Sequence, residues 1–332
     1  MPENLRRLLA EIRLVSPPLP RFERAADESA AAWRARIAAA RDDADMHALA
    51  HREAVDRAAS RLFGATAREL LPAVPDNLRQ SEVQVTAADR RVVDVSVTAP
   101  ARPSGAVVVR LHGGGFWMGG GRAARLLDRS LIEQLAATCG ATVLNVDYRL
   151  APEHPIPAAM DDVHDVLEAV RHGELGEDLD PRRIALIGTS SGANIAAAAA
   201  LADLGVDDPI AGLVLIVSSL RLDVPPASMH DDPAAWEERR GQLLGYLGEI
   251  SPKDPRASPA LSPSLGALPP VHAVVARHDE IADGGGELCA RVKMAGGVAE
   301  EHVYEMTHTV AAPHVEAAWV RGVTDFVGKV LG

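Results

Sequence analysis

Ser190 stands between two glycines in the run Gly188-Thr189-Ser190-Ser191-Gly192, and a serine in this setting can act as a nucleophile. An apolar run, Ile184 to Ile187, precedes the first glycine, and an alanine-rich segment follows the second. This order predicts a strand, a sharp turn with Ser190 at its apex, and a helix. The glycines are needed because a side chain at either position would collide with the neighbouring strand or helix. A βα turn whose small residues serve packing alone is the alternative.

A serine hydroxyl is a weak nucleophile at neutral pH, so it needs a base, and the base needs an orienting carboxylate. Two loops that follow later apolar runs offer these groups, with Asp279 in the first and His308 in the second. The chain order Ser190, Asp279, His308 is the one expected when the three groups stand on the loops of an open α/β sheet. Glu280 and Asp283 are the alternatives to Asp279, although Asp283 can instead cap the following helix.

Six glycines fall among the ten residues from His112 to Gly121, a density that excludes a helix or a central strand. Such a loop brings backbone N–H groups close to a ligand. A phosphate cradle would need the Lys-Ser/Thr of a P-loop, which is missing, and no suitably placed acidic residue supports a dinucleotide site. An oxyanion hole is the third interpretation, with the N–H groups of Gly114, Gly115 and Ser191 as donors. A glycine loop without a ligand is the plainest alternative.

The elements that must position these residues follow a strand–helix alternation. Nearly continuous apolar strands separated by helices predict an α/β fold with a mostly parallel sheet covered on both faces. We expect strands around 83–85, 92–97, 106–111, 141–146, 183–188, 210–217, 271–276 and 298–304, and helices at 122–138, 158–171, 191–204, 234–247, 283–295 and 313–331.

Two segments fall outside this alternation. Residues 1–75 are charged and helical, and they are either a flap over a site or an N-terminal addition, ahead of a catalytic domain at 76–332. Residues 221–265 are rich in proline and look like an insertion at the carboxyl end of a strand, where the sites of open α/β sheets lie. The candidate substrate-binding residues are Trp236, in this insertion, and Phe116 and Trp117, within the glycine loop.

The composition and net charge of the chain limit the kinds of binding partner that we expect. The chain has 332 residues, is 47% hydrophobic, and carries a net charge of −12 with no basic block, so nucleic acid is not expected. No run of 18 apolar residues exists, so a membrane span is not expected either. The two cysteines, Cys139 and Cys289, are far apart and show no metal-type spacing, which favours a reducing cytoplasm.

Together these residues resemble the hormone-sensitive-lipase-like carboxylesterases of the α/β-hydrolase fold. The matching pieces occur in the right order over about residues 83–330: His112 to Gly115, Asp147 to Pro155 with Ala158 to Asp162, Gly188 to Gly192, Asp254 to Pro259 before Leu268-Pro269-Pro270, and Asp279 with His308. The resemblance implies an eight-stranded sheet, a helical cap built from the N-terminal helices and the 221–265 insertion, and activity on esters of short to medium acyl chains. It implies a small-molecule ester as partner, with no metal or organic cofactor, and leaves a homodimer open.

Some positions depart from the family pattern. Ser191 and Ala193 stand where Ala and Gly are usual, Glu280 replaces a common proline, and Thr309-Val310 replaces a common Gly-Phe. The triad is intact, so these departures bear on substrate range, and a specialised biosynthetic ester or lactone stays open. Dehydration or acyl transfer on the same triad, and a non-catalytic small-molecule binder, are the remaining alternatives.

Overall fold

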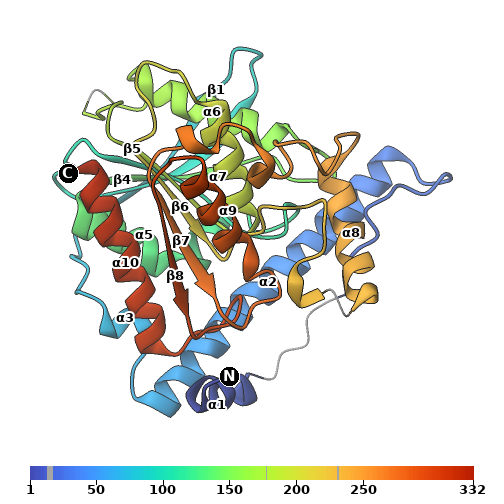
Figure 1. Cartoon of the computed structure of the whole chain (residues 1–332), viewed down its shortest axis with the longest axis horizontal. Helices are drawn as coiled ribbons and strands as arrows, with labels where there is room; N and C mark the ends of the chain where they lie inside the picture. The colour runs from blue at the N-terminus through green and yellow to red at the C-terminus, as the bar shows by residue number, and fades with distance from the viewer. Residues whose placement is uncertain (13–17, 177, 230–231) are drawn as a thin grey trace.

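The computed structural model describes residues 1–12, 18–176, 178–229 and 232–332, and one eight-stranded sheet forms its centre (Figure 1). The strands are β1 (Arg79–Thr86), β2 (Val92–Ala99), β3 (Val107–Leu111), β4 (Thr142–Asp147), β5 (Ile184–Thr189), β6 (Gly212–Ile216), β7 (Val271–Ala276) and β8 (Ala299–Tyr304). Their order in the sheet is β1-β2-β4-β3-β5-β6-β7-β8. β2 runs antiparallel to both β1 and β4, and every other neighbouring pair is parallel. The prediction of a mostly parallel eight-stranded sheet is confirmed.

Helices cover both faces of the sheet (Figure 1). They are α1 (Glu3–Glu11), α2 (Ala30–Phe63), α3 (Ala67–Leu70), α4 (Gly121–Leu127), α5 (Arg129–Cys139), α6 (Ala158–Arg171), α7 (Ser191–Ala202), α8 (Pro233–Leu247), α9 (Asp283–Met294) and α10 (Pro313–Leu331). One buried apolar cluster joins the sheet to α6, α7 and α9, and a second joins its other face to α5 and α10. The helices predicted from the sequence are therefore present, with small shifts at their ends and one break described below.

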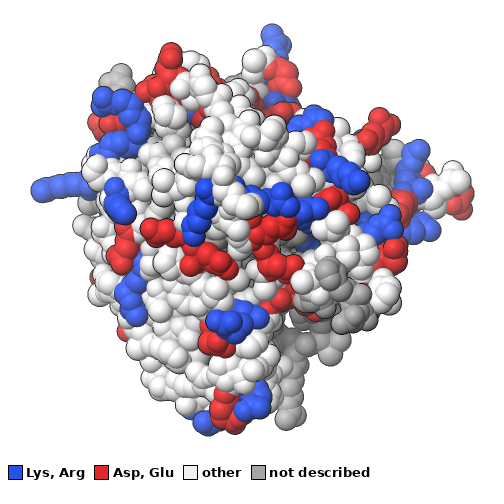
Figure 2. All heavy atoms as spheres, in the orientation of Figure 1, with Lys and Arg blue, Asp and Glu red and all other residues white. Residues whose placement is uncertain are grey.

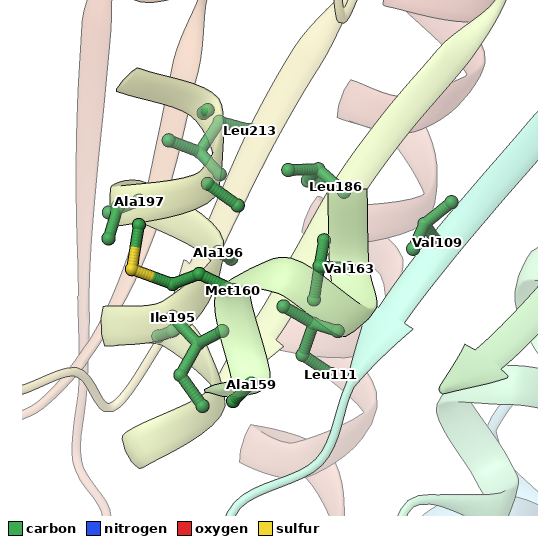
Figure 3. Close-up of a cluster of buried hydrophobic side chains, with 14 of the residues drawn as sticks. Val109, Leu111, Ala159, Met160, Val163, Leu186, Ile195, Ala196, Ala197 and Leu213 are labelled. Atoms are coloured by element: carbon green, nitrogen blue, oxygen red, sulfur yellow. The ribbon is translucent and has the colours of Figure 1, made fainter. Parts of the chain in front are cut away.

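The central strands are buried on both faces because their side chains alternate between the two clusters. Val107, Val109 and Leu111 of β3 face α6 and α7, whereas Val108 faces α5 and α10. Figure 3 shows how Val109, Leu111 and Leu186 of the sheet meet Val163 of α6 and the alanines of α7. Small side chains on α7 let this helix lie close to the strands. This close approach shapes the tight turn between β5 and α7.

The single helix predicted at 122–138 is wrong in one respect, because it breaks at Asp128 into α4 and α5. Asp128 leaves helical geometry, with φ −110° and ψ 25°, and its carboxylate pairs with the guanidinium of Arg110. Arg110 is fully buried, and its guanidinium also donates to Asn145 Oδ1 and to the carbonyl of Ala124. A buried cation requires such partners, and this long-range demand could not be seen in the local sequence.

The two segments that fall outside the strand–helix alternation, residues 1–75 and 221–265, pack on different parts of the domain. α2 contacts α4 and reaches the carboxyl edge of the sheet, whereas α3 packs on α10 (Figure 1). The 221–265 segment lies between β6 and β7 and contains α8, as predicted. Asn194 of α7 ties this segment to the body of the domain by donating to the carbonyls of Ser219 and Ala257, each at 2.9 Å.

Charged side chains of both signs are interspersed over the face shown in Figure 2. Many charged side chains of the described residues form ion pairs, such as Arg221 with Asp223 and Glu287. Within the described ranges, no helix combines the length and apolarity that a membrane crossing requires.

A buried carboxylate supports the loop after β4. Asp162 of α6 has a side chain only 1% exposed, and it accepts hydrogen bonds from the backbone N–H and the guanidinium of Arg149. Arg91, after the β1–β2 turn, pairs with both Asp162 and Asp165. Arg149, which follows Tyr148, is thereby held in place from α6.

We expect Asp162→Ala to lower the free energy of unfolding by about 3 kcal/mol, because it leaves two arginines without their buried partner. Asp165→Ala is the matched control, since its more accessible ion pair should contribute less than about 1 kcal/mol. Urea denaturation followed by circular dichroism measures both values. Equal losses in the two variants would contradict this account.

Candidate active site

The turn between β5 and α7 holds Ser190 in a strained conformation. Its φ is +55° and its ψ is −117°, which L-residues rarely adopt, and its N–H donates to the carbonyl of Ile216 at 2.8 Å. A Cβ on Gly188 would overlap Ala193, and a Cβ on Gly192 would overlap the carbonyls of Leu111 and His112. The backbone crossing is therefore possible only with glycine at these two positions, as the sequence predicted.

The loops after β7 and β8 bring Asp279 and His308 to this serine. His308 Nε2 lies 3.0 Å from Ser190 Oγ, and His308 Nδ1 lies 2.7 Å from Asp279 Oδ2. The other carboxylate oxygen of Asp279 accepts the N–H of Ile281 at 3.2 Å. The Asp279 side chain is 3% exposed and that of His308 is 36% exposed, so the pair runs from the interior to an accessible nitrogen. The three residues predicted to act together form one hydrogen-bonded chain.

Other ionisable residues of these loops are placed differently from Asp279. Asp283 is the first residue of α9, and its carboxylate accepts the N–H of Ala227 at 2.7 Å rather than capping its own helix. His278 Nε2 lies 2.8 Å from Glu305 Oε2, on the neighbouring loop. Glu280 lines the cavity described below. Among these acidic candidates, only Asp279 has a hydrogen bond to His308.

The glycine loop folds back over the serine turn. Gly114 and Gly115 have φ of +127° and +58°, and a Cβ on Gly114 would overlap the carbonyl of Met118. Gly113 packs directly against Thr189 and Ser190. The N–H groups of Gly114, Gly115 and Ser191 make no hydrogen bond to any part of the chain that the structure describes. These three N–H groups are thus free to bind a ligand, and Gly114 and Gly115 line the same cavity as Ser190.

The loop is held from below by a buried pair of rings. His112 and Tyr148 stack with ring centroids 4.2 Å apart, the hydroxyl of Tyr148 donates to the carbonyl of His112 at 2.6 Å, and His112 Nδ1 donates to the carbonyl of Gly113 at 2.7 Å. Burial lowers the pKa of His112 to about 3, so its imidazole is neutral at neutral pH. His112 therefore supports the loop through both its ring and its backbone carbonyl.

The loop is held from above by α2. Asp45 accepts the N–H of Gly119 at 2.7 Å, and Arg41 donates to the carbonyl of Trp117 at 2.6 Å while pairing with Glu153 at 2.8 Å. Sequence reasoning missed both residues, because they stand more than 70 positions before the groups they bind. The flap interpretation of the N-terminal segment is favoured over that of a mere addition.

A cavity of about 700 Å³ opens over Ser190 and His308. Its walls include Ala44 and Ala48 of α2, Trp117 of the glycine loop and Gln242 of α8.

The other two predicted substrate-binding aromatics do not line this cavity. Phe116 is buried and stacks on Tyr246 with ring centroids 3.7 Å apart, and Trp236 packs on the apolar core. Their aromatic character serves packing between α8 and the domain.

A buried ion pair lies at the wall of the same cavity. Arg52 of α2 pairs with Glu316 of α10 at 3.0 Å and with Asp56. Burial raises the pKa of Glu316 above its usual range, and the guanidinium of Arg52 opposes that rise. The pair therefore adds charged groups to the wall of the cavity.

The described residues contain one group that could hold a metal ion, formed by His272, Glu300 and His302 on β7 and β8. None of the three lines the cavity. The group is therefore separate from the serine and its partners.

Comparison with known proteins gives a consistent result. A family model described as the alpha/beta hydrolase fold matches residues 108–312. The chain is 35% identical over 250 residues to esterase LipI of Mycobacterium tuberculosis, covering 66% of this chain and 75% of that protein. It is also 35% identical over 216 residues to carboxylesterase NlhH of M. tuberculosis, covering 60% of this chain and 64% of that protein. Among solved structures, a bacterial heroin esterase superposes with a TM-score of 0.68 at 26% identity, covering 86% of this chain and 93% of that one.

We expect Asp45→Ala to lower kcat/KM for a soluble ester about fivefold, because the N–H of Gly119 loses its acceptor and the loop loses its upper tie. Asp45→Asn is the matched control, since an amide oxygen can still accept this hydrogen bond and activity should stay near that of the wild type. Steady-state kinetics of the two variants at pH 8 decide the matter, and equal activity would show that α2 does not support the loop.

Asp45 also makes the free energy of unfolding depend on pH. Burial raises the pKa of Asp45 to about 6, so the folded protein takes up this proton before the unfolded chain does, and the stability contributed by Asp45 rises as pH falls through 6. Asp45→Asn removes the titrating carboxyl group and with it this dependence of stability on pH. Its stability advantage over the wild type, measured by urea unfolding, should therefore be larger at pH 8 than at pH 5.

Proposed function

The chain belongs to the α/β-hydrolase family and, within it, to the hormone-sensitive-lipase-like carboxylesterases, hydrolases of carboxylic ester bonds, and from this premise we propose that Ser190, His308 and Asp279 are its catalytic triad. The observation that carries the proposal is the hydrogen-bonded chain from Ser190 Oγ through His308 to Asp279. Both distances lie within the range required of a nucleophile, its base and the group that orients the base.

The proposed reaction begins when Ser190 Oγ attacks the ester carbonyl and His308 Nε2 takes the hydroxyl proton. Asp279 accepts a hydrogen bond from His308 Nδ1, which fixes the tautomer and stabilises the imidazolium. The tetrahedral intermediate collapses as His308 passes the proton to the leaving alcohol, which leaves an acyl-enzyme on Ser190. Water then attacks this ester with the same base, releasing the carboxylic acid and restoring the serine.

The N–H groups of Gly114, Gly115 and Ser191 are the proposed oxyanion donors. They are unpaired by any described group, and Ser191 begins α7, where the helix dipole favours negative charge. Each such donor contributes about 3 kcal/mol in the transition state. Because the loop is tied at Gly113 and Gly119, these donors are oriented before the substrate arrives.

The proposed substrates are small esters with short to medium acyl chains, which a largely apolar cavity of about 700 Å³ can enclose. We assign their selection to the two cap segments, 1–75 and 221–265, because α2 and α8 supply cavity walls that the sheet does not. Both thiols, Cys139 and Cys289, are free, and a reducing cytoplasm is where we expect the enzyme to act.

Replacing Ser190 by Ala or His308 by Gln is expected to lower kcat by at least ~10³ on p-nitrophenyl esters, because the nucleophile or its base is lost. A fluorophosphonate probe should label the wild type at Ser190 and leave Ser190→Ala unlabelled. Labelling is read by intact-protein mass spectrometry.

His278→Gln is the matched histidine control on the adjacent loop, where His278 meets Glu305 and not Ser190. Its activity should stay within a few-fold of the wild type. If activity survives in both Ser190→Ala and His308→Gln, the reaction centre lies elsewhere.

Ala48→Phe tests whether α2 selects the acyl chain. The added ring would occupy cavity space, so kcat/KM for p-nitrophenyl octanoate should fall at least ~10-fold more than that for the acetate, since about 1.4 kcal/mol of chain burial is lost. Ala50→Phe, at an exposed position of the same helix, is the control. A parallel loss on both esters in Ala48→Phe would point to misfolding rather than selection.

A further inference from the structure

Two histidines and a glutamate gather on the face of β7 and β8 that α10 covers. Strand register pairs His272 with Glu300 and Val274 with His302, and Glu300 and His302 are two residues apart on one strand. Side chains two apart on a strand share a face, and His272 shares it as the register partner of Glu300. One nitrogen or oxygen from each residue lies within 4.8 Å of the other two.

The imidazole of His272 has no hydrogen-bond partner among the described residues. The residue is 2% exposed, yet neither Nδ1 nor Nε2 makes a hydrogen bond to any described group. His302 Nε2 is also buried without one, and Glu300 Oε2 lies 3.5 Å from it, too far for good hydrogen-bond geometry. Leaving a buried polar atom unpaired costs about 1–3 kcal/mol, so a group that satisfied these nitrogens would stabilise the fold.

We propose that His272, Glu300 and His302 bind one Zn²⁺ ion, with water in the fourth position. Two neutral imidazoles and a carboxylate are a donor set that this ion accepts in tetrahedral sites. Ligand atoms around zinc lie about 2.0–2.2 Å from the metal, hence roughly 3–4 Å from one another, so the three side chains need to close by about 1 Å.

The surroundings permit that closure. The rings of His272 and His302 stack with centroids 4.4 Å apart, so His302 has to turn out of this stacking before a nitrogen of each ring can point at one ion. His302 has a side chain 41% exposed and Glu300 is more exposed still, so both can turn without displacing the core. His272 stays fixed against Phe326 of α10.

Glycine on α10 leaves the space that the ring needs. A Cβ on Gly322 would come within 3.1 Å of Tyr304 Oη and 3.9 Å of the His272 ring. A larger residue here would press on the imidazole from the covered side. The ion would therefore bind at the solvent side of His272, between it and the two side chains of β8.

The role assigned to this ion is structural and does not touch the triad. It would join β8, the edge strand, to β7 by a link in addition to the backbone ladder. In Figure 1 these two strands lie side by side next to α10.

The test uses the full-length protein without a His tag, stripped with EDTA. Zn²⁺ is titrated by isothermal calorimetry, and the melting temperature is recorded with and without saturating Zn²⁺. We expect one high-affinity equivalent and a rise in melting temperature of about 2 °C or more. Co²⁺ in place of Zn²⁺ should give the visible absorption of a four-coordinate site.

His302→Ala should weaken Zn²⁺ binding at least ~10-fold and abolish the rise in melting temperature, and Glu300→Gln should do so in part. His164→Ala, an exposed histidine on α6, is the matched control and should bind like the wild type. The proposal is overturned if the wild type binds no Zn²⁺, or if His302→Ala binds it unchanged, as it would at His308. Neither readout depends on esterase activity, so this test and that of the triad fail independently.

Discussion

The close approach of α7 to the carboxyl ends of β3 and β5 is the constraint on which the rest of the site depends. No Cβ fits on Gly188 or Gly192, because the backbones of the strands and the helix are in contact there. This crowding drives Ser190 to a positive φ, a strain of roughly 1–3 kcal/mol that persists only where surrounding packing fixes it. The first ten residues of α7 are buried and provide that packing. The hydroxyl is thereby projected beyond the edge of the sheet.

A loop made of glycines cannot hold itself against that serine by side-chain packing, so polar groups of other elements hold it. Tyr148 fixes the carbonyl of His112 from below, and Asp45 of α2 fixes the N–H of Gly119 from above. Oxyanion donors help catalysis to the extent that they are oriented before charge develops. Helix α2 thus contributes to the proposed chemistry without presenting a reacting group, and it also lines the cavity.

Local signals explain what could be predicted from the sequence. The strand–helix alternation and the chain order of Ser190, Asp279 and His308 were sufficient to predict the sheet and the hydrogen-bonded chain. Contacts between distant residues were not accessible, which is why the break at Asp128 and the tie from Asp45 were missed. Phe116 shows a third limit: the side chain of an aromatic residue in a glycine loop can point into the cavity or into the core. Here a φ of +71° accompanies its stacking on Tyr246.

The same sheet gives its histidines opposite roles according to where on the strands they stand. His308 follows β8 at the carboxyl edge, where the loops leave the sheet and a nitrogen can reach Ser190. His272 lies within β7, where α10 covers it and none of the described groups forms a hydrogen bond with its nitrogens. β8 is held by a neighbour on one side only, and its pairing with β7 sets the distance between the loops that carry His308 and Asp279. A metal ion bound across these two strands would reinforce the sheet at the edge on which the geometry of the proposed triad depends.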